Sequence, residues 1–219
     1  APPPPLAAAP LPPRLPPLGA VKVDAHRRFV GADIPGLNEG ASEGAGLGIR
    51  FLKHLTRNRI LLHLVDMAPY DGVEPGEAAL SIVRELQRFS PALAGRERWL
   101  VLNKCDLLDE ETLARRRSEV IQALDWSGPV YAISAIKSEG TDTLCGDLMT
   151  YLEACRARQA ADPEVAAAEL EQQNRMQDEA RQRIAELRRQ HKQAAADADT
   201  DVDDDIGDDD FDVEVEYVP

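Results

Sequence analysis

Cysteine is scarce in this 219-residue sequence, and long apolar runs are absent. Cys105, Cys145 and Cys155 are odd in number and form no Cys-x-x-Cys pair, so we expect free thiols in a reducing cytosol rather than disulfides or a zinc site. No stretch of 18 apolar residues occurs, so we expect no membrane span. The proline-rich start has no basic segment of the kind that opens a signal peptide. These absences favour a cytoplasmic protein.

The formal net charge of −14 comes almost entirely from one end of the chain. Residues 197–216 contain twelve acidic residues and no Lys or Arg, so the rest of the chain carries a formal charge of −2. Such a segment repels the phosphates of nucleic acids, and we expect no DNA partner.

Composition divides the chain into four segments. Residues 1–18 contain nine prolines, which fix φ and remove backbone donors, so we expect a disordered segment there. Residues 19–158 carry the alternating apolar patterns of a folded domain. Residues 159–196 are rich in Ala, Glu, Gln and Arg, and Asp162-Pro163 is a helix start signal, which together predict a single solvated helix. Self-repulsion should leave residues 197–219 disordered.

Strand and helix patterns alternate within the segment 19–158. Two short strands at 21–24 and 28–33 are close enough to form an antiparallel hairpin. A helix is expected from about residue 47, and the continuous apolar run 60–66 predicts a strand that is buried on both faces. Further strands are expected at 98–102 and 130–134, and further helices at 77–89, 110–124 and 141–155. This alternation predicts an α/β fold with a mainly parallel sheet, covered on both faces, whose ligand lies at the carboxyl ends of the strands.

Three polar clusters lie at expected strand ends. The first is Asp33, Ile34, Pro35 and Gly36; the second is Asn103, Lys104, Cys105 and Asp106; the third is Ser134, Ala135 and Ile136. In the first cluster, Asp can hold Mg²⁺ through water and Gly lets a backbone N–H approach a γ-phosphate. In the second, Asp can accept hydrogen bonds from both N1 and N2 of guanine while Asn and Lys brace the loop. In the third, backbone N–H groups can donate to O6 of the base. The alternative is that each cluster is a turn or a helix cap, which explains each alone but not their joint order.

These clusters lie in segments that resemble the Obg (CgtA) family of GTPases. The resemblance covers about residues 19–155, and its segments are ADIPGLNEGASEGAGLGIRFLKHLTRNRILLHLVD (32–66), RWLVLNKCDLL (98–108) and YAISAIKSEG (131–140). It implies a P-loop-NTPase-like G domain of the TRAFAC type. The helix and acidic tail that follow are similar to the extensions of some proteobacterial members.

The resemblance also implies a function. Members hydrolyse GTP with Mg²⁺, act in ribosome biogenesis and associate with the large ribosomal subunit and its rRNA. Asp33–Gly36 would contact magnesium and the γ-phosphate, and Asn103–Asp106 with Ser134–Ile136 would bind guanine. Leu37 stands where Ras-like proteins place a water-orienting Gln, which implies slow hydrolysis assisted by another group, a potassium ion or a partner. No catalytic residue is assigned.

In its N-terminal part, the sequence departs from the pattern of the Obg family. It contains no Gly-Lys pair, and hence no GxxxxGK[ST] loop to cradle phosphates. The switch I threonine segment and the glycine-rich N-terminal domain are not recognisable either. We therefore expect an N-terminally incomplete G domain, by truncation or frameshift, with an unpaired sheet edge. The alternative function is a non-catalytic fragment that serves as a ribosome or partner interaction module. We expect a monomer.

Two further features allow more than one interpretation. Arg50, Lys53, Arg57 and Arg59 form a basic cluster, which is either a solvated helix face or an rRNA contact. His63 lies in an expected buried strand and has no metal-ligand pattern around it, so we expect a hydrogen-bonded core residue.

Overall fold

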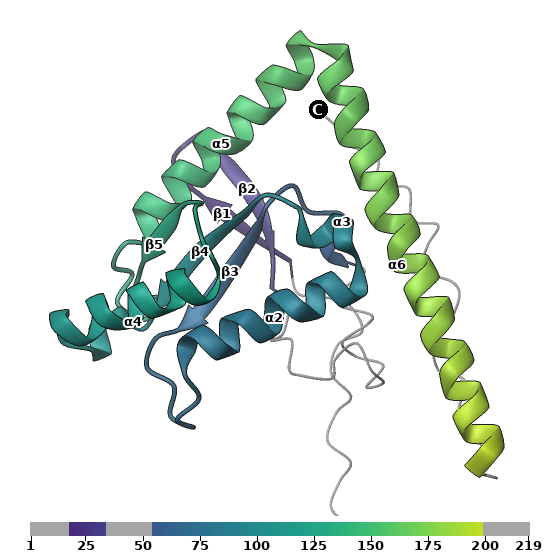
Figure 1. The fold of residues 1–219 in the computed structure, drawn as a ribbon. Coiled ribbons are helices and arrows are strands. Elements are labelled where there is room, and N and C mark those ends of the chain that lie inside the picture. The colour runs from purple at the N-terminus through teal and green to yellow at the C-terminus, as the bar shows by residue number, and fades with distance from the viewer. Residues whose placement is uncertain (1–17, 34–53, 199–219) are drawn as a thin grey trace, which may run out of the picture.

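A computed structural model describes residues 18–33 and 54–198 (Figure 1). The first two strands, β1 (Leu18–Lys22) and β2 (Arg28–Ala32), pair antiparallel. Asp24 stabilises the turn between them, because its Oδ1 accepts hydrogen bonds from the backbone N–H groups of His26 and Arg27, each at 2.9 Å. The predicted hairpin is confirmed, although β1 begins at the last position of the segment that was expected to be disordered.

A three-stranded parallel sheet forms the centre of the fold, with its strands in the order β3-β4-β5. The strands are β3 (Leu61–Asp66), β4 (Arg98–Asn103) and β5 (Val130–Ala132). The helices are α2 (Pro75–Phe89), α3 (Pro91–Ala94), α4 (Glu110–Ala123), α5 (Thr141–Ala161) and α6 (Pro163–Ala198), with a 3-10 turn, η1, at Cys105–Leu107. The predicted strands and helices after residue 60 all occur, with ends that differ by a few residues. The helix expected from residue 47 lies mostly outside the described residues.

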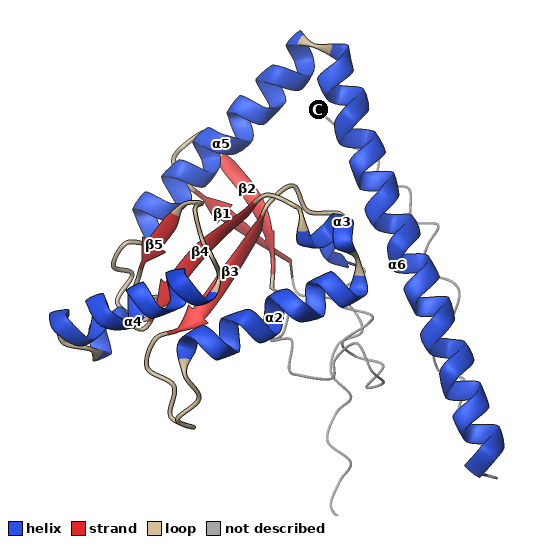
Figure 2. Ribbon diagram, viewed as in Figure 1, coloured by secondary structure: helices blue, strands red, loops and turns tan. Residues whose placement is uncertain are grey.

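Helices cover both faces of the sheet (Figure 2). On one face, α2 and α4 pack on β3 and β4 in a buried cluster of Val65, Met67, Ala79, Leu100, Leu102 and Val120. On the other face, α5 packs on β4 in a buried cluster of Trp99, Val101, Ile133, Leu144 and Leu148. The predicted α/β fold, a parallel sheet flanked by helices, is therefore confirmed.

The prediction that strand 60–66 is buried on both faces is wrong. The side chains of Leu61 and Val65 are buried, whereas those of Leu62 and Leu64 are 37% and 58% exposed. Among the described strands, β3 pairs with β4 alone, so it is the edge of the three-stranded sheet. The continuous apolar run here belongs to a half-covered edge strand, because α5 packs on β4 and leaves this side of β3 open.

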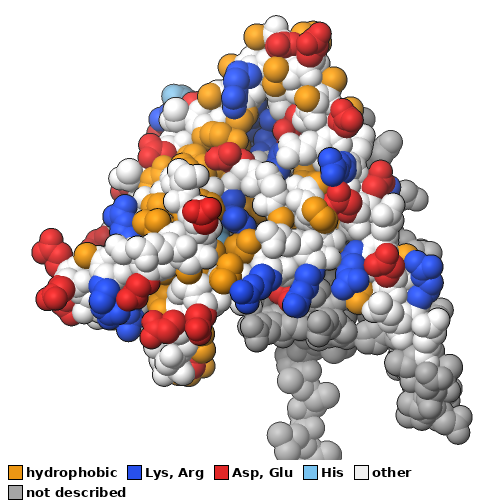
Figure 3. Space-filling view, viewed as in Figure 1, with side chains coloured by type: hydrophobic (Ala, Val, Ile, Leu, Met, Phe, Trp, Pro, Cys, Tyr) orange, Lys and Arg blue, Asp and Glu red, His pale blue; other side chains and the backbone are white. Residues whose placement is uncertain are grey.

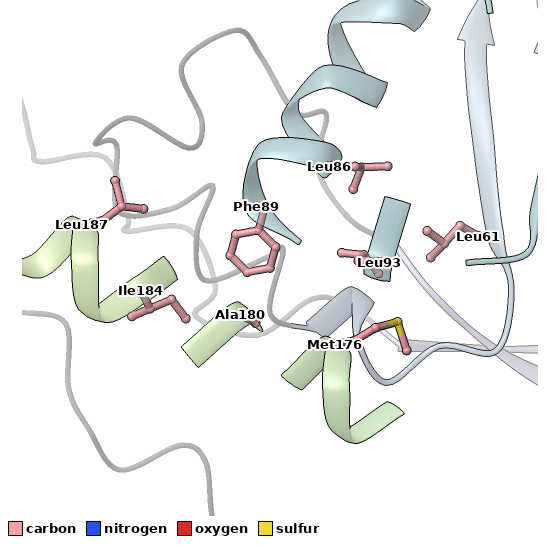
Figure 4. Close-up of a cluster of buried hydrophobic side chains, with 8 residues drawn as sticks. All are labelled: Leu61, Leu86, Phe89, Leu93, Met176, Ala180, Ile184 and Leu187. Carbon is pink, nitrogen blue, oxygen red and sulfur yellow. The ribbon is translucent and has the colours of Figure 1, made fainter. Parts of the chain in front are cut away.

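The prediction of a solvated C-terminal helix is also wrong, because α6 packs along α2 and α3 (Figure 1). Four of its side chains are at most 6% exposed: Met176, Ala180, Ile184 and Leu187. They face Phe89 and other apolar side chains of α2 and α3 (Figure 4). Their spacing of three and four residues places them on one stripe of the helix. Val165 and Leu170, nearer the start of α6, remain exposed.

Polar contacts hold α6 at two further points. Glu179 accepts hydrogen bonds from the Ser90 hydroxyl at 2.7 Å and from the Ala92 N–H at 2.9 Å. Both donors lie at the start of α3, where backbone N–H groups have no partner within the helix. Nearer the start of α6, the buried Arg96 pairs with Glu169. The charged helix is therefore joined to the α/β domain by polar and apolar contacts together.

His63 is buried, as predicted, but the expected hydrogen bond is absent. Its side chain points to the α2 side of the sheet with the residue 6% exposed, and neither ring nitrogen has a hydrogen-bond partner in the described part of the chain. Burial, with a smaller contribution from the charge of Arg98, lowers the pKa of His63 to about 4. The imidazole is therefore neutral at physiological pH.

The predicted basic cluster is only partly described. Arg50 and Lys53 lie outside the described residues, Arg57 is exposed, and Arg59 donates a hydrogen bond to Gln159 of α5 at 2.7 Å. Arg59 therefore contributes to packing between elements rather than to a fully solvated face. On the side of the molecule in Figure 3, acidic and basic side chains both occur across the helices.

Two further observations concern the cysteines and the length and polarity of the helices. All three cysteines are free and half-buried. Within the described ranges, every helix is too short or too polar to cross a membrane.

Candidate functional site

Polar side chains gather at the carboxyl ends of the three parallel strands. Asp66 ends β3 and is in register with Asn103, which ends β4. Ser134 follows β5 by two residues. The residue before it, Ile133, is hydrogen-bonded to the loop after β4, because the Cys105 N–H donates to the Ile133 carbonyl at 3.1 Å. This is the edge at which open α/β sheets bind their ligands.

Asn103 joins two of the predicted clusters. Its Oδ1 accepts hydrogen bonds from the backbone N–H of Lys104 at 2.8 Å and from that of Ala135 at 3.0 Å. One side chain therefore holds the loop after β4 against the loop after β5. This is the bracing role that was expected for Asn103, although the residue that it braces directly is Ala135.

Lys104 connects β4 to η1 through a left-handed backbone conformation, with φ of 64°. A residue with a Cβ adopts this conformation only under constraint from its surroundings. Its ammonium lies 2.6 Å from the carboxylate of Asp66. The Lys104 side chain is thus fixed across the ends of two adjacent strands.

Asp106 is the most enclosed carboxylate of the site. Its side chain is 5% exposed, and its Oδ1 is buried with no hydrogen-bond partner among the described residues. Its Oδ2 lies 3.4 Å from the ammonium of Lys137. A hydrogen bond with Ser134 lowers the pKa of Asp106, and pairing with Lys137 lowers it further, so the carboxylate is ionised at neutral pH. A buried acceptor without a donor is costly to maintain unless a ligand donor satisfies it.

The loop after β5 is tightly closed. Ser134 and Glu139 exchange two backbone hydrogen bonds, at 3.0 and 3.1 Å, and the Ser134 hydroxyl accepts one from the Lys137 N–H at 3.3 Å. Gly140 ends the loop with φ of 75°, and a Cβ there would lie 2.6 Å from the carbonyl oxygen of Ala132. The loop therefore requires glycine at this position.

The Ser134 and Ala135 N–H groups, which were expected to donate to O6 of a base, both have protein partners in this structure. The Ser134 N–H donates to Glu139, and the Ala135 N–H donates to Asn103. Ile136 is 90% exposed, at the outside of the loop. Ligand contact by the Ala135 N–H would require Asn103 to give up one of its two donors.

Of the first predicted cluster, only Asp33 lies within the described residues. Asp33 follows β2 as an exposed residue, and β2 belongs to the separate two-stranded sheet. Ile34, Pro35 and Gly36 lie outside the described residues. Within residues 18–33 and 54–198, no group of three or more His, Cys, Asp or Glu side chains could hold a metal ion. The structure thus brings together the second and third clusters, Asn103–Asp106 and Ser134–Ile136.

Two residues of this site were not predicted from the sequence. Asp66 is the acidic residue at the end of the apolar run 60–66, and that position is the signal in the sequence for a role beside Lys104. Lys137 has no comparable signal, because it is an exposed lysine in a polar loop and its relation to Asp106 depends on how that loop closes.

A scan of the chain against models of known protein families finds no match. The fold and the site define an α/β protein with a parallel sheet flanked by helices and with a polar site at the carboxyl ends of its strands.

Proposed function

We propose that this chain belongs to an Obg-type GTP-binding protein that hydrolyses GTP with Mg²⁺ and acts in biogenesis of the large ribosomal subunit. The observation that carries the proposal is the ionised, enclosed Asp106, held beside the Asn103–Ala135 bridge at the carboxyl ends of β4 and β5. The sequence resemblance of residues 32–66, 98–108 and 131–140 to the Obg family supplies the reaction and the ribosomal partner.

Base recognition follows from the chemistry of these groups. A carboxylate has two oxygens that accept hydrogen bonds side by side, and guanine presents N1–H and N2–H in the same arrangement. Adenine has no such pair of donors on that edge. The low pKa of Asp106 keeps both oxygens as acceptors, and its buried Oδ1 is left to be satisfied by a ligand donor. Asp106 therefore selects guanine over adenine.

Phosphate recognition rests on the resemblance. Asp33 would hold Mg²⁺ through water, and the Gly36 N–H would approach the γ-phosphate. Leu37 cannot orient a water molecule, so hydrolysis is slow unless another group, an ion or a partner assists it. The 219 residues contain no Gly-Lys pair, so base contacts are the part of the proposal that this chain can test directly.

The decisive experiment is a titration of the chain with fluorescent GDP and GTP. We expect binding that guanosine nucleotides compete for and adenosine nucleotides do not. Asp106→Asn replaces one acceptor oxygen with a donor, so the preference should move from guanine towards xanthine, which has an oxygen in place of the N2 amino group. Asp125→Asn removes the same charge from an exposed residue just beyond α4 and should change nothing. Equal preference in the Asp106→Asn variant and the wild type would refute the base assignment.

The second candidate is a non-catalytic module that binds the ribosome or another partner. It is favoured by the closure of the site, because Asp106 is paired with Lys137 and its Oδ1 is buried. Affinity separates the two candidates. Base contacts alone correspond to millimolar dissociation constants, about −4 kcal/mol, whereas binding tighter than about 10 μM needs phosphate contacts as well. Binding in that tighter range would contradict the interaction module.

A further inference from the structure

Asp106 and Lys137 form an ion pair within the candidate site. The ammonium of Lys137 lies 3.4 Å from Oδ2 of Asp106. The two side chains differ in accessibility, since that of Lys137 is 51% exposed and that of Asp106 is 5% exposed. The Asp106 carboxylate, which is proposed to accept hydrogen bonds from the base, is therefore enclosed, whereas the Lys137 ammonium is accessible to solvent.

The backbone around Lys137 is fixed, so its side chain is the movable part. The Lys137 N–H is bound to the Ser134 hydroxyl, and Ser134 is tied to Glu139 by two backbone hydrogen bonds. Ser138 follows with φ of 57°, a conformation that closes the turn. A lysine side chain has four rotatable bonds beyond its Cα, so the ammonium can leave Asp106 without any change in this loop.

The other lysine of the site does not compete for Asp106. The ammonium of Lys104 is paired with Asp66 at 2.6 Å. In the described structure, Asp66 is therefore paired with Lys104, and Asp106, the carboxylate that is proposed to bind the base, is paired with Lys137.

We propose that Lys137 is a latch: its ammonium occupies Asp106 in the nucleotide-free protein and must swing out before a guanine base can pair with that carboxylate. The inference rests on the proposed function and adds a residue that lowers the affinity for the nucleotide. A base with two donors, placed as in guanine, replaces the cation by satisfying both oxygens. A base without them leaves Asp106 paired with Lys137.

The latch has a measurable effect on affinity. An ion pair with one exposed partner is weak, so removing the charge should tighten guanine-nucleotide binding by about 1.5- to 5-fold. Salt screens such a pair, so the difference between the variant and the wild type should shrink at high ionic strength. A lysine that contacts the nucleotide itself would give the opposite sign, because its removal would weaken binding.

The test uses the full chain and a fluorescent GDP analogue at about 50 mM and 500 mM NaCl. Lys137→Met removes the charge and keeps the stem, and Lys137→Arg keeps the charge. Lys22→Met, on the exposed side of the hairpin, controls for the change in net charge. We expect tighter binding by Lys137→Met alone, with a gain that is smaller at the higher salt concentration.

Each other outcome overturns the latch in a recognisable way. If the wild type binds and Lys137→Met binds equally or more weakly, the latch is wrong and the proposed function stands. If Lys22→Met tightens binding as much as Lys137→Met, the effect is one of net charge and the latch is wrong. If no variant binds guanine nucleotide while all remain folded by circular dichroism, the proposed function fails and the latch fails with it.

Discussion

The buried His63 should make the stability of this protein sensitive to mild acid. In the folded state its ring has no hydrogen-bond partner among the described residues and its pKa is about 4, whereas an exposed histidine has a pKa of 6.5. The unfolded state therefore binds a proton between pH 6.5 and pH 4 that the folded state does not. Stability is unaffected by this residue above pH 6.5 and falls as the pH drops below it.

The size of the effect follows from that difference. Each pH unit below 6.5 lowers the free energy of unfolding by about 1.4 kcal/mol until the pH reaches the folded-state value. At pH 5, His63 should therefore have lowered the free energy of unfolding by about 2 kcal/mol, which is a large share of the stability of a small domain. Other acid-sensitive groups act at the same time, so the effect must be read as a difference between two variants.

The variant His63→Leu removes the titrating ring and keeps an apolar side chain in the core. We expect its free energy of unfolding, measured with urea, to fall about 2 kcal/mol less than that of the wild type between pH 7.5 and pH 5. At pH 7.5 it should be at least as stable, because two unpaired buried nitrogens are gone. His26→Gln, in the exposed hairpin turn, should follow the wild type. Parallel pH curves for the wild type and His63→Leu would refute the reasoning.

Three further predictions concern packing, loop geometry and base recognition. Met176→Ala, in the buried stripe of α6, should lower the free energy of unfolding by about 2 to 5 kcal/mol in urea, whereas the exposed Val165→Ala should change it by less than about 0.5 kcal/mol. Gly140→Ala should destabilise the protein by more than about 1 kcal/mol in thermal unfolding, because the φ of Gly140 is 75° and an added Cβ would lie 2.6 Å from a backbone oxygen. Gly146→Ala should stabilise the protein slightly, because Gly146 lies in α5 with open space around it. Asp106→Asn should move nucleotide preference towards xanthine in competition titrations, and an unchanged preference counts against the guanine site.

Much of the fold could be predicted from local patterns. The runs 98–102 and 130–134 and the helical patterns at 77–89 and 110–124 all correspond to observed elements. Period and propensity are properties of adjacent residues, so they survive whatever the tertiary arrangement. The run 60–66 was correctly predicted as a strand, but its exposure was not, because exposure depends on which neighbours the strand has in space.

For α6 too, the local pattern predicted the helix, whereas its packing depended on the tertiary structure. Its start at Pro163 was readable from an Asp-Pro signal. Its docking was not, because four apolar side chains among many charged ones give a weak periodic signal. Only the complementary surface of α2 and α3, with Phe89 at its centre, makes that stripe a buried one.

The candidate site divides in a similar way. The sequence by itself determined the order of the motifs and their places at strand ends, since parallel strands must bring their carboxyl ends to one edge. It also singled out Asn103, Asp106 and Ser134. Only the tertiary structure decided how they are paired: Asn103 with the Ala135 N–H, Lys104 with Asp66, and Asp106 with Lys137. The partners in all three pairs are far apart in the sequence. Hydrogen bonds and ion pairs act over a few ångströms, so distance in space rather than position in the sequence selects them.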